Sequence, residues 1–143
     1  MVLVVGYDRH PASRAALVFA GELAGALNVP LHVVHVVDDA DDALTAPRTS
    51  ASLGAEHPDA YHLHIGDALG DVHWTYHRLQ GDPATVLLEA TNQHRASMLI
   101  VGRPEQGIGA AFGHIITGNV ARNLLRRSNR PVVVVPEFGT VPQ

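Results

Sequence analysis

Glycine is concentrated between residues 102 and 118, and this composition is typical of a loop that binds phosphate. The segment contains Gly102, Gly107, Gly109, Gly113 and Gly118. A phosphate site needs backbone N–H donors and close approach; glycine permits both, and the start of a helix adds the positive end of a dipole. Arg103 supplies positive charge, and Asn119 can cap the following helix or donate its amide to an oxygen. A surface loop of small residues is the alternative interpretation.

A carboxylate follows the first apolar run of the chain. Residues 2–5 are all aliphatic, and Gly6 and Tyr7 lead from them to Asp8. At the carboxyl end of a buried strand, the Asp8 carboxylate can accept hydrogen bonds from ribose hydroxyls. Its alternative role is that of an ordinary turn residue that satisfies nearby backbone amides.

Other nucleotide-binding and catalytic patterns do not match. The chain has no G-x-x-x-x-G-K-[ST], a lone glycine follows the first strand, and no G-x-S-x-G is present. It has no cysteine, which excludes disulfides and thiolate sites. No spacing forces two carboxylates together. We therefore expect no dedicated catalysis, with slow ATP hydrolysis left open.

Ten histidines raise the question of a metal site. His73 and His77 share one strand face, but four residues separate their backbones by about 13 Å at roughly 3.3 Å per residue. His62 and His64 are closer, yet no third ligand accompanies them. We expect no metal other than Mg²⁺ that accompanies a nucleotide, and favour a composition effect or modest proton sensitivity.

Strand and helix patterns alternate along the chain, which predicts one α/β domain over residues 1–143 with an open parallel sheet and helices on both faces. We expect strands at 2–5, 31–37, 72–79, 98–101 and 132–135, and helices at about 11–27, from 82–83 onward and at about 119–127. Residues 60–68 read either as a weak helix or as loop. Ligands of such sheets bind at the carboxyl ends of the strands.

Composition and hydropathy narrow the remaining classes of protein to which the chain could belong. Hydrophobic residues make up 46% of the 143 residues and the net charge is -4, so there is no electrostatic reason to expect nucleic acid as a partner. No apolar run approaches the roughly 18 residues of a membrane span. The amino terminus does not read as a signal peptide. We expect a cytoplasmic protein without membrane or nucleic-acid partners.

Several segments in order resemble the universal stress protein family. They are VVGYD (4–8) with PASRAAL (11–17), LHVVHVVD (31–38), GDPA (81–84), GNV (118–120) and SNRPVVVV (128–135). The resemblance implies a Rossmann-like, adenine nucleotide α-hydrolase-like sheet with strand order 3-2-1-4-5. It also implies a homodimer through the last strand, with an interface formed by Val132, Val133, Val134 and Val135.

The same resemblance implies a stress-response regulator that binds ATP or AMP. Asp8 matches the residue that holds the adenosine part, the Val36 backbone matches the adenine contact, and the glycine-rich segment matches the loop around ribose and phosphates. The implied nucleotide site comprises Gly6, Tyr7, Asp8, Val36, Gly102, Arg103, Gly107, Gly109, Gly118, Asn119 and Val120.

Three features depart from the family pattern and leave an alternative open. Asn119 stands where ATP binders typically carry a hydroxyl residue, the segment 102–118 is longer than usual, and Arg9-His10 replaces the common glycine-serine. The alternative is a homodimeric interaction protein of the same fold that binds no nucleotide.

Overall fold

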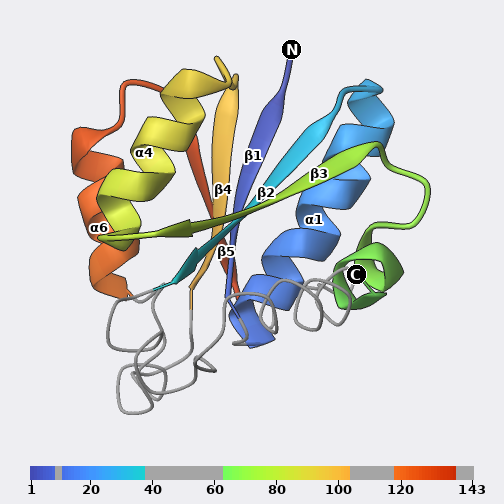
Figure 1. Cartoon of the computed structure of the whole chain (residues 1–143), viewed down its shortest axis with the longest axis horizontal. Helices are drawn as coiled ribbons and strands as arrows, with labels where there is room; N and C mark the ends of the chain where they lie inside the picture. Colours follow the sequence, from blue (N-terminus) through green and yellow to red (C-terminus); the bar gives the residue numbers. More distant parts are fainter. Residues whose placement is uncertain (9–10, 38–62, 104–117, 138–143) are drawn as a thin grey trace, which may run out of the picture.

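Five parallel strands form one sheet in the order β3-β2-β1-β4-β5. The computed structural model describes residues 1–8, 11–37, 63–103 and 118–137 (Figure 1). The strands are β1 (Leu3–Tyr7), β2 (Leu31–Val37), β3 (Trp74–Gln80), β4 (Met98–Arg103) and β5 (Val132–Pro136). The predicted fold class and strand order are confirmed.

The helices between the strands include α1 (Pro11–Leu27), α4 (Pro83–Gln93) and α6 (Gly118–Arg127). Residues 63–69 are also helical, so the described part of the uncertain segment 60–68 is helix rather than loop. Asp82 caps α4 as predicted, because its carboxylate accepts a hydrogen bond from the Thr85 N–H at 3.0 Å and Pro83 follows it. That bond lowers the pKa of Asp82.

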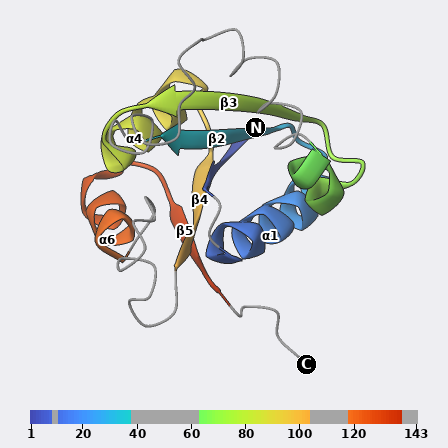
Figure 2. The ribbon, with the colours of Figure 1, turned by 60° about the horizontal axis from the view of Figure 1, so that its bottom comes forward.

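The helices cover the two faces of the sheet, as Figure 2 shows, with α1 on one side and α4 and α6 on the other. Alternate strand residues supply the two cores, since successive side chains of a strand point to opposite faces. Leu3, Val5 and Val33 pack on the α1 side, whereas Val4 and Val34 pack on the α4 side. Two apolar layers therefore hold the strand ends in fixed positions.

The edge strands are β3 and β5, as their sequences predict. In β3, the Trp74 and Tyr76 side chains pack on the α1 face and are half-buried. Prolines bracket the valines of β5, and Pro131 precedes the strand without a backbone donor to lose. The strand β1 extends two residues beyond the predicted 2–5 because Gly6 and Tyr7 continue the pairing with β2.

The order in which the chain visits the strands determines where a ligand is expected to bind to this sheet. From β1 the chain moves outward to β2 and β3, and then returns to the other side of β1 for β4 and β5. The carboxyl ends of β1 and β4 therefore flank the point where the winding reverses. Within the described residues, no helix has the length and apolar character needed to cross a membrane.

Candidate functional site

The carboxyl edge of the sheet brings together the ends of β1, β2 and β4 and the first turn of α6 (Figure 1). Asp8 follows β1, Val36 lies near the end of β2, and Gly102 and Arg103 end β4. Because all five strands are parallel, these positions share one end of the sheet. Within the described segments, the site residues predicted from the sequence thus lie at the carboxyl ends of the strands or at the start of α6.

Asp8 is tied to the start of α1 by two hydrogen bonds with Ser13. The backbone N–H of Asp8 donates to Ser13 Oγ at 3.0 Å, and the Ser13 hydroxyl donates to the Asp8 carboxylate at 2.7 Å. Both residues are buried, with Asp8 only 5% exposed. The carboxylate therefore has the turn-stabilising role that the sequence left open, and its position at the sheet edge is fixed.

Gly102 lies against the first turn of α1. A Cβ on Gly102 would come within 2.2 Å of the Ala12 carbonyl oxygen and 2.5 Å of its carbonyl carbon. No side chain fits there without moving backbone, so glycine is required for close packing of β4 on α1. This packing holds the helix start beside the end of β4. Sequence reasoning had considered this glycine only as part of a phosphate loop.

Tyr7 and Val36 turn their side chains into the two cores and not toward the edge. Tyr7 is 1% exposed on the α1 side, and Val36 is fully buried on the α4 side. Only their backbone groups can therefore face a ligand at the carboxyl edge. This matches the backbone role that the sequence resemblance implies for Val36.

A partly buried polar cluster beneath the carboxyl ends of the strands was missed by sequence reasoning. The Tyr7 hydroxyl hydrogen-bonds His64 Nδ1 at 2.9 Å, and its ring meets His35 edge-on at 5.3 Å between centroids. His35 Nδ1 in turn bonds the Tyr76 hydroxyl at 2.7 Å. The cluster links β1, β2, β3 and the helix 63–69, and its strand members share the α1 face. The alternation of side chains along the strands, which places these residues on one face, was the sequence signal that could have revealed the cluster.

The start of α6 completes the described part of the edge. Gly118 begins the helix, Asn119 is exposed, and Val120 packs on the core of the α4 side. The first turn carries no acidic side chain, so no carboxylate there neutralises the positive end of the helix dipole or repels an anion. Arg103 is exposed at the end of β4. Gly107 and Gly109 lie outside the described residues.

Comparison with known proteins gives a consistent family match. A model of the Universal stress protein family matches residues 1–136. The chain is 27% identical over 143 residues to a universal stress protein of Mycolicibacterium smegmatis, covering 93% of this chain and 47% of that protein. It is 23% identical over 162 residues to the stress response protein NhaX of Bacillus subtilis, covering 93% and 96%. The chain spans about half the length of the M. smegmatis relative.

Solved structures share the fold. A universal stress protein in complex with cAMP is 24% identical, with a TM-score of 0.66 and coverage of 96% of this chain and 97% of that chain. A universal stress protein from Archaeoglobus fulgidus in complex with dAMP is 21% identical, with a TM-score of 0.64 and coverage of 94% and 96%. At these identities the likeness shows the same architecture.

Proposed function

Because this chain belongs to the universal stress protein family, we propose that it binds an adenine nucleotide, ATP or AMP, at the carboxyl edge of its sheet. The observation that carries the proposal is the placement of Asp8, Gly102 and the first turn of α6 at the point where the winding reverses. In this proposal the protein is a stress-response regulator and not a metabolic enzyme.

Each part of the edge has a role that its chemistry suits. The Asp8 carboxylate accepts a hydrogen bond from a ribose hydroxyl while Ser13 holds it in place. The backbone of Val36, whose side chain is buried and not available to a ligand, contacts adenine. Backbone donors at Gly118 and Asn119 meet phosphate at the start of α6, with Arg103 as a nearby cation.

Further contacts complete the proposed site. We also assign Gly6 and Tyr7, which end β1, to the site, and Val120 supports the first turn of α6 from the core. We assign Gly107 and Gly109 to the phosphates because they belong to the same glycine-rich segment. Mg²⁺ in this proposal accompanies the phosphates of the nucleotide.

Relatives support the choice of ligand. Two solved structures of the same fold are described as complexes with cAMP and dAMP, both of which are adenine nucleotides. Adenosine is their shared part, and this proposal assigns adenosine to the ends of β1 and β2. The phosphate end differs among such ligands and is the part for which Asn119 departs from the family pattern.

The experiment is calorimetric titration of the purified chain with ATP and with AMP, after a check for nucleotide that copurifies. We expect D8A to weaken binding about tenfold or more, a loss of about 1.4 kcal/mol or more. The matched control is S13A, which keeps the carboxylate and removes only the hydroxyl that positions it. We expect S13A to bind more tightly than D8A.

Absence of heat with either nucleotide at millimolar concentration, together with no copurified nucleotide, would overturn the proposal. Equal affinity of the wild type and D8A would keep nucleotide binding but refute the role of Asp8. Release of phosphate above background, lost in D8A, would instead reveal a slow ATP hydrolase.

A second candidate function is a homodimeric interaction protein that binds no nucleotide. Asn119, at the start of α6, favours it because this side chain offers no hydroxyl to a phosphate. The dimer itself belongs to both candidates: Val132, Val133 and Val134 on the edge strand β5 are only partly buried, and an exposed apolar edge favours pairing with a second copy. Light scattering of V134K against the wild type tests the dimer; a monomeric wild type would contradict it.

A further inference from the structure

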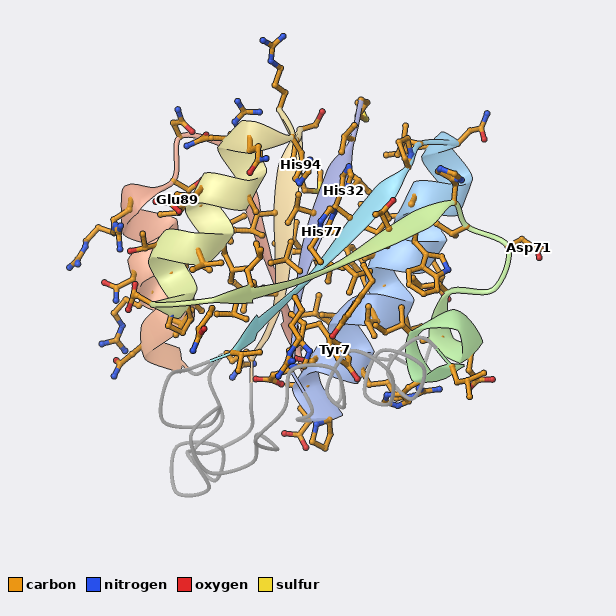
Figure 3. All side chains as sticks on the ribbon, viewed as in Figure 1. Tyr7, His32, Asp71, His77, Glu89 and His94 are labelled. Atoms are coloured by element: carbon orange, nitrogen blue, oxygen red, sulfur yellow. The ribbon has the colours of Figure 1, made fainter. Side chains whose placement is uncertain are left out.

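Three histidines from three different elements meet near the amino end of β2. His32 is the second residue of β2, His77 lies in the middle of β3, and His94 is the C-cap of α4 (Figure 3). Each offers one ring nitrogen, and these three atoms all lie within 4.8 Å of one another. All three rings are half-buried. We call these residues the histidine cluster.

The contacts within the histidine cluster are close and specific. His32 Nδ1 and His77 Nε2 share a hydrogen bond of 2.9 Å. The rings of His32 and His94 stack with 3.9 Å between centroids and 13° between planes. The His77 and His94 centroids are 4.9 Å apart. Side chains from the sheet and from a helix end thus bring three ring nitrogens together.

The register of the sheet explains why His32 and His77 meet. His32 pairs with Thr75, so His77 lies two residues further along β3 on the same face. That face is the α4 side, since the neighbouring Val34 and Val36 pack there. The helix α4 ends at Gln93, and the next residue brings its imidazole over the two strands. Long-range pairing, and not sequence spacing, assembles the cluster.

The protonation state of the histidine cluster suits a metal ion, which binds only unprotonated imidazole nitrogen. Burial and the neighbouring imidazoles of His94, His77 and His73 lower the pKa of His32 to about 4. Burial and His94 lower the pKa of His77. Both rings are therefore neutral at pH 7 and carry a lone pair, as metal ligands must.

We propose that His32, His77 and His94 form a binding site for a divalent transition-metal ion, Zn²⁺ in the first place. Imidazole nitrogen is a preferred ligand of such ions, and three histidines leave a fourth tetrahedral position for water. Zn–N bonds of about 2.0–2.1 Å separate tetrahedral ligand atoms by roughly 3.3 Å. Binding needs the 2.9 Å hydrogen bond to open slightly and the wider pairs to close.

Proton positions allow this rearrangement without charging a ring. A neutral imidazole carries its single proton on either nitrogen. When the protons of His32 and His77 lie on Nε2 and Nδ1, respectively, the two facing nitrogens of their hydrogen bond are both free to coordinate. A metal replaces that bond and joins the edge strand β3 to the end of α4.

The site is separate from the proposed nucleotide site. His32 lies at the amino end of β2, whereas Asp8 follows the carboxyl end of β1. Figure 3 shows the histidine cluster and Tyr7 toward opposite ends of the sheet. Failure of nucleotide binding and failure of metal binding are therefore distinguishable results.

The test is calorimetric titration of the chelator-treated, tag-free 143-residue chain with ZnCl₂ in the absence of nucleotide and phosphate. Absorption of Co²⁺ in the visible range provides a second probe of tetrahedral coordination. We expect one ion per chain with a micromolar or lower Kd, about -8 kcal/mol or stronger, and a rise in Tm with added Zn²⁺. H77Q and H94Q each weaken binding at least about tenfold.

The matched control is H64Q, which removes an imidazole that bonds Tyr7 on the other face of the sheet. We expect H64Q to bind Zn²⁺ as the wild type does. His94 lies at a helix end, and its cap is made by the backbone N–H, so H94Q keeps that cap even where H77Q disturbs the sheet. No binding by the wild type, or equal affinity in the wild type, H77Q and H94Q, would overturn the proposal.

Discussion

Gly102 and Ala12 are in backbone contact: a Cβ on Gly102 would lie 2.2 Å from the Ala12 carbonyl oxygen. The contact joins the end of β4 to the first turn of α1. Close packing of α1 on β4, one of the two strands that flank the reversal of winding, therefore requires a residue without a Cβ at position 102.

The first prediction concerns this contact. We expect G102A to reduce the free energy of unfolding by about 3 kcal/mol or more, because the obstructing atoms are backbone and cannot rotate away. The measurement is urea unfolding followed by circular dichroism. The control is G25A, in the exposed part of α1, where a Cβ meets Val72 at an ordinary 3.8 Å and a better helix former gains up to about 1 kcal/mol. Equal stability of the two variants would contradict the contact.

The second prediction concerns the cap of α4. We expect D82A to cost about 1 kcal/mol of unfolding free energy, because the Thr85 N–H loses its acceptor. D82N keeps a capping oxygen and should cost less. Since the hydrogen bond lowers the pKa of Asp82 below its ordinary value of 3.8, the Asp82 contribution is complete above that value and declines as pH falls through the lower folded pKa.

Stability curves between neutral and acidic pH check the second prediction. The stability difference between the wild type and D82N should shrink as Asp82 becomes protonated, because the neutral amide of D82N does not titrate in this range. A difference that stays constant down to about pH 2, below the reference pKa of an aspartate, would show that the carboxylate charge contributes nothing to the cap.

The third prediction concerns Ser13. Its hydroxyl both accepts the Asp8 N–H and donates to the Asp8 carboxylate within a buried turn. S13A leaves both groups without this partner, and we expect a loss of about 2 kcal/mol in unfolding free energy. S13T, which retains the hydroxyl, should lose less. A wild-type stability for S13A would show that the two hydrogen bonds do not stabilise the turn.

The fourth prediction concerns the helix 63–69. The Tyr7 hydroxyl and His64 Nδ1 form a hydrogen bond that connects this helix to β1. We expect Y7F to cost about 1 kcal/mol and to speed amide hydrogen exchange in 63–69 more than in α4. The double variant with H64Q should be less destabilised than the sum of the single variants. Strict additivity would mean that the two side chains do not interact.

Much of the fold could be predicted because its signals are local. Asp82-Pro83 predicted the start of α4, and the valines between Pro131 and Pro136 predicted an edge strand. The alternation of Val72, Trp74 and Tyr76 predicted a half-buried strand, although the strand begins at Trp74. Each of these signals depends on neighbouring residues and on the periods of helix and strand.

The histidine cluster and the Gly102 contact could not be predicted because they depend on register between distant elements. Spacing along one strand paired His73 with His77 and argued against a shared metal. In the structure the partners of His77 are His32, from the neighbouring strand, and His94, from a helix end. Ligand roles along the carboxyl edge stay predictions, and those of Gly107 and Gly109 fall outside the described residues.

The strand β2 reaches both proposed sites, with His32 near its start and Val36 near its end. It pairs with β1 over residues 31–35 on one side and with β3 over residues 31–37 on the other. Sliding such a strand would break both ladders at once and move every side chain to the opposite face. The sites at the two ends of β2 should therefore bind independently, so that a ligand in one site leaves the affinity of the other unchanged.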